Sequence, residues 1–246
     1  MSHLISRRSW IAGMPAAGSL LLAGCKASLP PTYGSLYDLS NALTFASHRL
    51  LLRNQPLARE FSRDKISRHF PAINTTNPES SRYQRLLSGG FSEWRLPVEG
   101  LVFRPTELSL DVLKRFPSRT QVTQHNCEQG WSAIAEWTGV PLARMLQEVG
   151  TLPQARYVVL YTIDGWWDSL DMFDALHPQT LLAYGMNGRE LPVPHGAPVR
   201  LRVERQLGYK SLKYVSRIKI TDRLDDIEDG TGAVGAAYGY SWYSGI

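Results

Sequence analysis

The sequence predicts an α+β fold, in which a strand-rich mixed sheet domain carries a few short helices. Three observations indicate this class. Apolar residues recur at every second position in most segments after residue 91, helical spacing is confined to short stretches, and strands do not alternate regularly with helices. The 246 residues are 43% hydrophobic, which is enough to form the core of one large domain.

Residues 1–24 have the pattern of an export signal. Arg7 and Arg8 precede an apolar stretch that is too short to span a bilayer. Paired arginines at this place are typical of the twin-arginine route, although an ordinary secretory signal remains the alternative. The run that ends in Leu-Ala-Gly-Cys25 predicts cleavage and lipidation of Cys25. We therefore expect a periplasmic lipoprotein that is held on a membrane surface.

The segment that follows the signal predicts a tether and then a helix. Residues 25–34 contain two adjacent prolines, as expected of a tether. Leucine and alanine recur at helical spacing over 35–53, and the pattern ends before Pro56, so residues 35–58 form an N-terminal helical segment. The polar stretch 59–81 predicts an irregular loop over the domain.

The remaining elements are expected in one domain over 59–229. Two helices are predicted at 109–116 and 140–149, the second bounded by Pro141 and Gly150, and a third begins at Asp171. The Gly-rich and aromatic tail 230–246 is expected to run irregularly over the surface. Period-two patterns predict strands over 93–98, 101–104, 119–125, 156–162, 181–186, 199–203 and 214–221.

The charge and the cysteine content of the chain restrict its expected partners and the expected role of Cys127. With 27 basic and 22 acidic residues, nothing suggests a nucleic-acid partner. Because Cys25 is predicted to carry lipid, Cys127 is the other cysteine and no disulfide is expected. Cys127 follows a predicted strand, so it is a buried filler, a nucleophile or a metal ligand. Six scattered histidines give no zinc-ligand spacing, whereas a soft metal that brings most of its ligands needs only one thiolate.

Three segments, in order, resemble the sulfite oxidase superfamily. His125 to Ser132 (His-Asn-Cys-Glu-Gln-Gly-Trp-Ser) is similar to its molybdenum-ligand segment, and residues 195–200 and 208–214 are similar to its two pterin-binding segments. The resemblance covers about residues 60–222 and is closest to the branch that contains the periplasmic methionine sulfoxide reductase catalytic subunit. It implies an oxidoreductase that transfers an oxygen atom or two electrons at a molybdenum centre, with Mo-molybdopterin as cofactor.

The resemblance also implies the site residues. Cys127 would be the catalytic metal ligand to molybdenum. The implied cofactor-binding residues are Cys127, Asn74, Thr162, His195, Arg200, Ser211, Leu212 and Lys213.

The segment 200–219 independently favours a phosphate-bearing ligand, because it contains seven basic residues and only one acidic residue, Glu204. We expect Arg200 and Lys213 to meet near one phosphate or pterin edge. Arg202, Arg217 and Lys219 are expected on a solvated strand face.

Departures from the sulfite oxidase pattern shape the expected substrate and partner. Sulfite oxidases have an asparagine-arginine pair shortly after the cysteine, where this chain has Gly130-Trp131, so sulfite is disfavoured. A neutral or aromatic-walled pocket is expected instead, and its candidate walls, which core packing could equally explain, are Trp131, Trp166 and Trp167. We expect a small-molecule or protein-bound substrate, and a sulfoxide is one candidate. With no Cys-x-x-Cys-His haem site, electrons are expected to come from a separate redox partner, a membrane cytochrome.

Two other functions remain open from the residues alone. In a thiol-dependent enzyme, Cys127 would be the nucleophile and His125 or His195 its base. In a non-catalytic lipoprotein, the same fold would act as a binding module.

Overall fold

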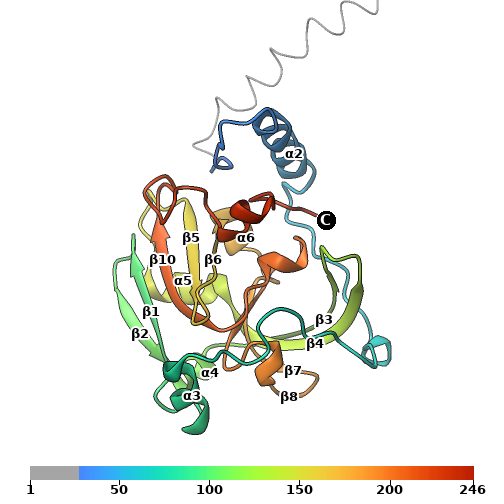
Figure 1. Cartoon of the computed structure of the whole chain (residues 1–246), viewed down its shortest axis with the longest axis vertical. Helices are drawn as coiled ribbons and strands as arrows, with labels where there is room; N and C mark the ends of the chain where they lie inside the picture. Colours follow the sequence, from blue (N-terminus) through green and yellow to red (C-terminus); the bar gives the residue numbers. More distant parts are fainter. Residues whose placement is uncertain (1–27) are drawn as a thin grey trace, which may run out of the picture.

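The structure, a computed structural model, describes residues 28–246. The predicted signal and the predicted lipidation site Cys25 lie outside the described residues. Within them, the strands form two five-stranded sheets (Figure 1), and the α+β prediction is confirmed. No helix of residues 28–246 is long and apolar enough to cross a membrane.

The first sheet has the strand order β2-β1-β10-β5-β6. Its β1–β10 pair is parallel and its other pairs are antiparallel. The strands are β1 (Arg95–Gly100), β2 (Thr106–Ser109), β5 (Tyr157–Thr162), β6 (Trp167–Asp171) and β10 (Val215–Thr221).

The second sheet is antiparallel, with the order β3-β4-β7-β8 and with β9 paired to β7. Its long β3–β4 hairpin matters most for the site, because the turn between these strands contains Cys127. The strands are β3 (Arg119–Asn126), β4 (Ser132–Pro141), β7 (Leu181–Met186), β8 (Arg189–Glu190) and β9 (Arg200–Arg202).

The main core lies between the two sheets. Leu96, Val158 and Ile218 of the first sheet share one buried cluster with Val140 and Leu201 of the second. Short helices close its sides. The helical elements are α2 (Asp38–Leu51), α3 (Ser81–Ser88), α4 (Leu110–Arg115), α5 (Leu142–Val149) and α6 (Met172–Ala175), with 3-10 turns η1 (Arg63–Lys65), η2 (Val193–His195), η3 (Gly208–Lys210) and η4 (Val234–Tyr238).

Side-chain caps and glycines set several helix ends where the sequence predicts them. Asp171 caps α6 by accepting a hydrogen bond from the amide of Asp174, and Ser109 caps α4 through the amide of Val112. Gly150 ends α5 with a φ of 68°, a left-handed conformation that glycine adopts without strain.

Several sequence expectations differ from the structure. The strand expected at 101–104 is wrong: the chain turns after Gly100, and β1 pairs with β2 at 106–109. The helix α3 and the strands β2, β4, β6 and β8 were not predicted. Six of the ten residues of β4 and all five of β6 are buried, so their sequences lack the period-two alternation of half-exposed strands.

The tail 230–246 is also better packed than expected. Ala233, Trp242 and Tyr243 are buried in a second cluster with Phe45 of α2 and Tyr157 of β5. The Trp242 indole donates to Ser169 Oγ over 2.7 Å. The prediction that the tail runs over the surface is therefore wrong for these residues.

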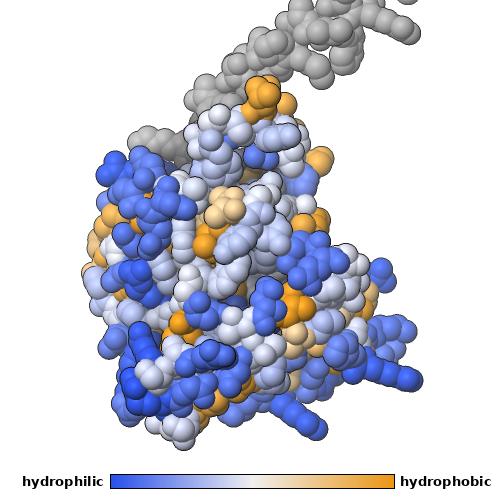
Figure 2. Space-filling model, in the orientation of Figure 1, coloured by the Kyte–Doolittle hydropathy of each residue, from blue (hydrophilic) through white to orange (hydrophobic). Residues whose placement is uncertain are grey.

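The N-terminal segment lies against the domain at the same end of the molecule (Figure 1). Ser28 Oγ donates to the carbonyl of Arg156 over 3.0 Å, and the backbone of Leu29 exchanges two hydrogen bonds with the Tyr157 hydroxyl. The predicted helix is confirmed as α2. Separate apolar residues stand out on the surface around this helix, at its top and right-hand edge, among residues of intermediate hydropathy (Figure 2).

Candidate active site

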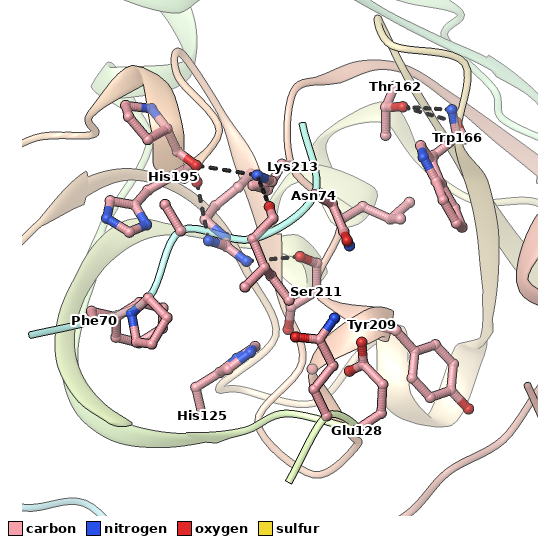
Figure 3. Close-up of a pocket in the computed structure, with 18 of the residues that line it drawn as sticks. Phe70, Asn74, His125, Glu128, Thr162, Trp166, His195, Tyr209, Ser211 and Lys213 are labelled. Atoms are coloured by element: carbon pink, nitrogen blue, oxygen red, sulfur yellow. Dashed lines mark hydrogen bonds between the residues drawn. The ribbon is translucent and has the colours of Figure 1, made fainter. Parts of the chain in front are cut away.

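A cavity of about 300 Å³ opens where loops of both sheets meet. Loop 70–74, the turns after β3 and β5, and the segment 194–213 form its walls, and tail residues complete it. The side chains that close on this space are shown in Figure 3. The cavity brings together seven predicted cofactor-binding residues that lie far apart in sequence: Asn74, Thr162, His195, Arg200, Ser211, Leu212 and Lys213.

Cys127 lies in the tight turn that closes the β3–β4 hairpin. Its amide donates to the carbonyl of Trp131 over 2.9 Å, and Gly130, at a φ of 89°, returns a bond to the Cys127 carbonyl. The thiol is buried and lies 3.5 Å from Glu128 Oε2. Burial raises the pKa of Cys127 to about 11, and the Glu128 carboxylate adds to the rise. The thiol itself does not line the cavity, whereas Glu128 and Gln129 beside it do.

His125, two residues before Cys127, is fixed by a buried arginine. Arg202 NH1 lies 2.7 Å from Nδ1 of His125. Because a guanidinium can only donate, His125 must be the neutral tautomer that carries its proton on Nε2. Burial and the charge of Arg202 lower the pKa of His125 to about 2. Gly208 packs against the other side of the ring, where a Cβ would lie 2.4 Å from Nε2.

This arrangement corrects two expectations. Arg202 does not lie on a solvated face: it is buried and forms an ion pair with Glu204 at 2.7 Å. His125 is also unsuited to act as a base for a thiol nucleophile, because its acceptor nitrogen already holds the Arg202 guanidinium. Arg217 is about one-third exposed and pairs with the exposed Glu99, as expected of a solvated face.

Two cations at the cavity have no carboxylate partner. Within residues 28–246, neither Arg200 nor Lys213 forms an ion pair, whereas the nearby Arg202, Arg205 and Lys210 all do. These three pair with Glu204, Asp174 and Asp168, respectively. Glu128 and Asp164 also line the cavity, but they accept hydrogen bonds from Cys127 and Thr162.

Arg200 and Lys213 use backbone carbonyls instead. Arg200 donates to the carbonyls of His195 and Ser211 at 3.0 and 2.8 Å. Its buried Nε has no hydrogen-bond partner in the described part of the chain. Lys213 donates to the carbonyls of Ile73, Thr75 and Pro194. The lysine thus holds loop 73–75 against the segment that contains His195 (Figure 3).

The positive charge of this cluster is only partly compensated. Burial and the charge of Arg202 lower the pKa of Arg200 to about 9. Burial and then the charge of Arg200 lower the pKa of Lys213 to about 8. His195 responds in the same way: burial, Arg200 and Lys213 lower its pKa to about 4. A bound anion would relieve this repulsion.

The other predicted residues shape the walls. Thr162 Oγ1 donates to Asp164 at 2.5 Å and accepts from the amide of Trp166, which fixes the turn between β5 and β6. Ser211 Oγ accepts from the amide of Val203 at 3.1 Å. Leu212 is buried in the main core. Asn74 has a φ of 56°, in the left-handed region, within the loop that Lys213 holds.

Aromatic residues form the remainder of the cavity. Trp131 and Trp166 line it, whereas Trp167 is buried in the second core cluster and is a packing residue. Sequence reasoning missed the other aromatic lining residues, which are Phe70, Tyr209, Tyr238 and Tyr240.

The missed aromatics belong to loops and to the tail. Phe70 makes edge contacts with Trp131 and His195 at 5.9 and 5.5 Å. Tyr240 stacks on Tyr209 at 4.8 Å. An aromatic residue next to Pro71 in an otherwise polar loop was the one signal that could have identified Phe70.

The donors of this cavity fit a molybdopterin. Unneutralised Arg200 and Lys213 suit its phosphate, and the orphan Nε of Arg200 offers a buried donor. One thiol at the edge of the cavity suits a metal that brings its other ligands. Within residues 28–246, no cluster of three or more His, Cys, Asp or Glu side chains is arranged to hold a metal.

The fold and site define a molybdopterin-dependent oxidoreductase, and comparison with known proteins agrees. Residues 87–227 match the family described as the oxidoreductase molybdopterin binding domain, and the chain belongs to this family. It is 32% identical over 244 residues to a protein of Azospira oryzae that carries the provisional name protein-methionine-sulfoxide reductase subunit YedZ1. The match covers 99% of this chain and 89% of that protein.

A second relative is the protein-methionine-sulfoxide reductase catalytic subunit MsrP of Xanthomonas campestris pv. campestris. It is 30% identical over 227 residues, which cover 85% of this chain and 67% of that protein. Among solved structures, the sulfane dehydrogenase SoxCD from Paracoccus pantotrophus superposes with a TM-score of 0.51 at 27% identity. That similarity covers 58% of this chain and 40% of the SoxCD chain.

The family and function predictions are confirmed: the protein is a molybdenum-dependent oxidoreductase. The thiol-enzyme and binding-module alternatives are set aside. The hydrogen bond that occupies His125 and the family membership both argue against the thiol-dependent enzyme. The catalytic subunits among the relatives argue against the binding module.

Proposed function

We propose that this protein reduces the sulfoxide of methionine residues in peptides or proteins. The observation that supports this substrate most is the aromatic-walled cavity beside the Cys127 turn, and the unneutralised Arg200 and Lys213 in the same cavity support the cofactor that the reaction needs. The names of the two relatives point to the same substrate. In the balanced reaction, the sulfoxide takes up two electrons and two protons, its S–O bond breaks, and a thioether and water are formed.

Two groups of residues would have different roles, one binding the metal and the other binding the rest of the cofactor. Cys127, as a thiolate, would hold the molybdenum. Arg200 and Lys213 would neutralise the anionic part of the molybdopterin, with Asn74, Thr162, His195, Ser211 and Leu212 around it. When bound, the cofactor supplies two-electron, oxygen-atom chemistry.

The aromatic walls favour a neutral, sulfur-containing substrate. Trp166 stacks on the exposed Tyr238 at 5.6 Å, and both rings line the cavity with Trp131. Sulfur groups pack well against aromatic rings. Gly130 and Trp131 stand where sulfite oxidases have their asparagine-arginine pair, so no arginine is available there for an anionic substrate. This difference supports a sulfoxide over sulfite.

Export, lipid attachment and electron supply complete the proposal. The twin arginines and the Cys25 lipobox support a periplasmic lipoprotein on a membrane surface. The sequence has no haem-attachment motif, so the electrons would come from a separate redox partner, a membrane cytochrome. Replacing Arg7 and Arg8 by lysine should leave a cofactor-loaded precursor in the cytoplasm. Normal processing in a strain without the twin-arginine machinery would contradict this route.

The activity can be tested with the full chain purified from a host that has this export machinery and makes the cofactor. With reduced benzyl viologen as electron donor, we expect turnover of a peptide that contains methionine sulfoxide, in proportion to molybdenum content. Sulfite oxidation with ferricyanide should be much slower. Molybdenum-loaded protein that oxidises sulfite and leaves the sulfoxide peptide unchanged would overturn the substrate assignment.

A further inference from the structure

Exposed leucines run along α2 and the turn before it, and we define them as the leucine stripe: Leu39, Leu43 and Leu50 of the helix and Leu36 of the turn. The exposed fractions of Leu36, Leu39, Leu43 and Leu50 are 98%, 71%, 55% and 52%. At 3.6 residues per turn, the three helical leucines share one side of α2. Every exposed position of α2 is uncharged. A surface helix normally has charged and polar residues on its outer side, so this face is unusual for one that meets only water.

The helix cannot turn these leucines inward. On its inner side, Phe45 is buried and packs edge-on against Tyr243 at 5.1 Å. Arg49 forms ion pairs with Asp171 and Asp174, each at 2.8 Å. Rotation of α2 would break these partly buried ion pairs, which is costly. The leucine stripe is therefore held outward by the fold.

The position of the stripe relative to Cys25 suggests what covers it. Ser28 and Leu29 are hydrogen-bonded to Arg156 and Tyr157, and Tyr157 shares a buried cluster with Phe45 of α2. Only three peptide links separate Cys25 from Ser28, a span of about 10 Å at most. A lipid on Cys25 would therefore bring this end of the domain to the bilayer surface.

We infer that the leucine stripe lies in the interface of the membrane that carries the Cys25 lipid. This inference rests on the proposed lipid attachment. A helix with an apolar side inserts in this way parallel to the bilayer. The exposed Arg53 and Arg59, just beyond the helix, suit anionic headgroups. The four leucines of the stripe offer much less area than the roughly 800 Å² per partner of a stable protein interface, which favours lipid over a second copy of the chain.

This contact adds a second attachment to the lipid. One lipid group on a chain that is free to pivot would leave the orientation of the cavity variable, whereas two attachments fix it. The domain would then present its cavity at a constant angle to a membrane-bound electron donor.

The test places a nitroxide spin label on the stripe, through Leu43→Cys in the exported full chain on phosphatidylethanolamine and phosphatidylglycerol vesicles. The matched control is Phe103→Cys, a similarly exposed site at 69% in the loop between β1 and β2. Protein without an introduced cysteine shows whether the buried Cys127 takes up label. The measured quantity is the collision rate of the label with oxygen divided by its collision rate with an aqueous nickel complex. We expect this ratio to be at least threefold higher for the label at 43 than for the label at 103.

Each other outcome overturns the inference. Equal nickel accessibility at 43 and 103 would show that the stripe faces water. Spectral broadening that disappears on dilution with unlabelled protein would show a second copy. If mass spectrometry finds no lipid on Cys25, the anchoring proposal fails, and vesicles added to that protein still decide whether position 43 enters lipid. None of these readouts depends on molybdenum content or sulfoxide turnover, so the proposed catalytic function is tested separately.

Discussion

Arg202 joins the strand β9 to His125 at the end of β3 through a 2.7 Å hydrogen bond, across 77 positions of sequence. The same guanidinium pairs with Glu204 and lies 4.5 Å over the ring of Trp137. His125 in turn lies two residues before Cys127. The segment that contains the unneutralised Arg200 and the turn that contains the thiol are therefore held in one arrangement by a buried arginine.

Arg202→Met should destabilise the protein by about 3–5 kcal/mol, because it leaves the carboxylate of Glu204 buried without its charge partner. Urea unfolding of the cofactor-free protein measures this loss. The double variant Arg202→Met/Glu204→Met removes both charges and should recover much of the stability. A double variant as unstable as the single one would show that packing, and not the buried charge, sets the cost.

Arg200→Ala should lower cofactor retention tenfold or more. A hydrogen bond to a charged group contributes about 1.5–3 kcal/mol, and Arg200 has no carboxylate partner within residues 28–246. Lys213→Ala should have a similar effect, because it also releases loop 73–75. Arg217→Ala, whose exposed ion pair with Glu99 contributes little, is the control. Molybdenum and pterin content after purification checks all three, and equal occupancy would show that the two cations do not bind the cofactor.

The cofactor-free protein should lose stability as the pH falls from 6.5 to 4, in part because of His195. The pKa of His195 is lowered from 6.5 to about 4 in the folded state. In this window, the unfolded chain binds a proton that the folded chain does not, so acid favours unfolding. His195→Asn should flatten the dependence of melting temperature on pH over this window. An unchanged slope in His195→Asn would contradict this assignment.

Tyr238→Ala should raise the KM for a sulfoxide-containing peptide severalfold while molybdenum content stays constant. Tyr238 is 67% exposed and stacks on Trp166 at the cavity, so its loss removes a surface for the substrate and little core packing. Tyr238→Phe keeps the ring and should restore the KM. A fall in kcat at constant KM, or no rescue by phenylalanine, would argue against a substrate-binding role.

Much of the fold was predictable from local patterns. The strand at 214–221 and the helix before Gly150 follow from alternation and from terminal residues, which are properties of neighbouring positions. By contrast, β6 is buried throughout, so a pattern that depends on one exposed face cannot reveal it. The packed tail was also missed, because the burial of Trp242 depends on Ser169, far away in sequence.

The functional site, like the fold, was only partly predictable from the sequence. The resemblance identified segments, and seven of the implied residues do share one cavity. Which cations are neutralised could not be read from sequence: Arg200 and Arg202 are two positions apart, yet only Arg202 faces Glu204. The contribution of Tyr238 and Tyr240 was equally hidden, because the tail reaches the cavity only through tertiary packing.

X-ray absorption at the molybdenum edge can show whether Cys127 is the protein ligand of a molybdenum cofactor, because it counts the sulfur neighbours of the metal. The full chain and its Cys127→Ser variant would be purified from a host that makes the cofactor. Cys127→Ser is nearly isosteric and should leave the fold intact. We expect molybdenum in the wild-type protein and one sulfur neighbour fewer around the metal of the variant, with sulfoxide reduction abolished. An identical sulfur shell in both proteins, or full turnover by the variant, would show that Cys127 does not bind the metal.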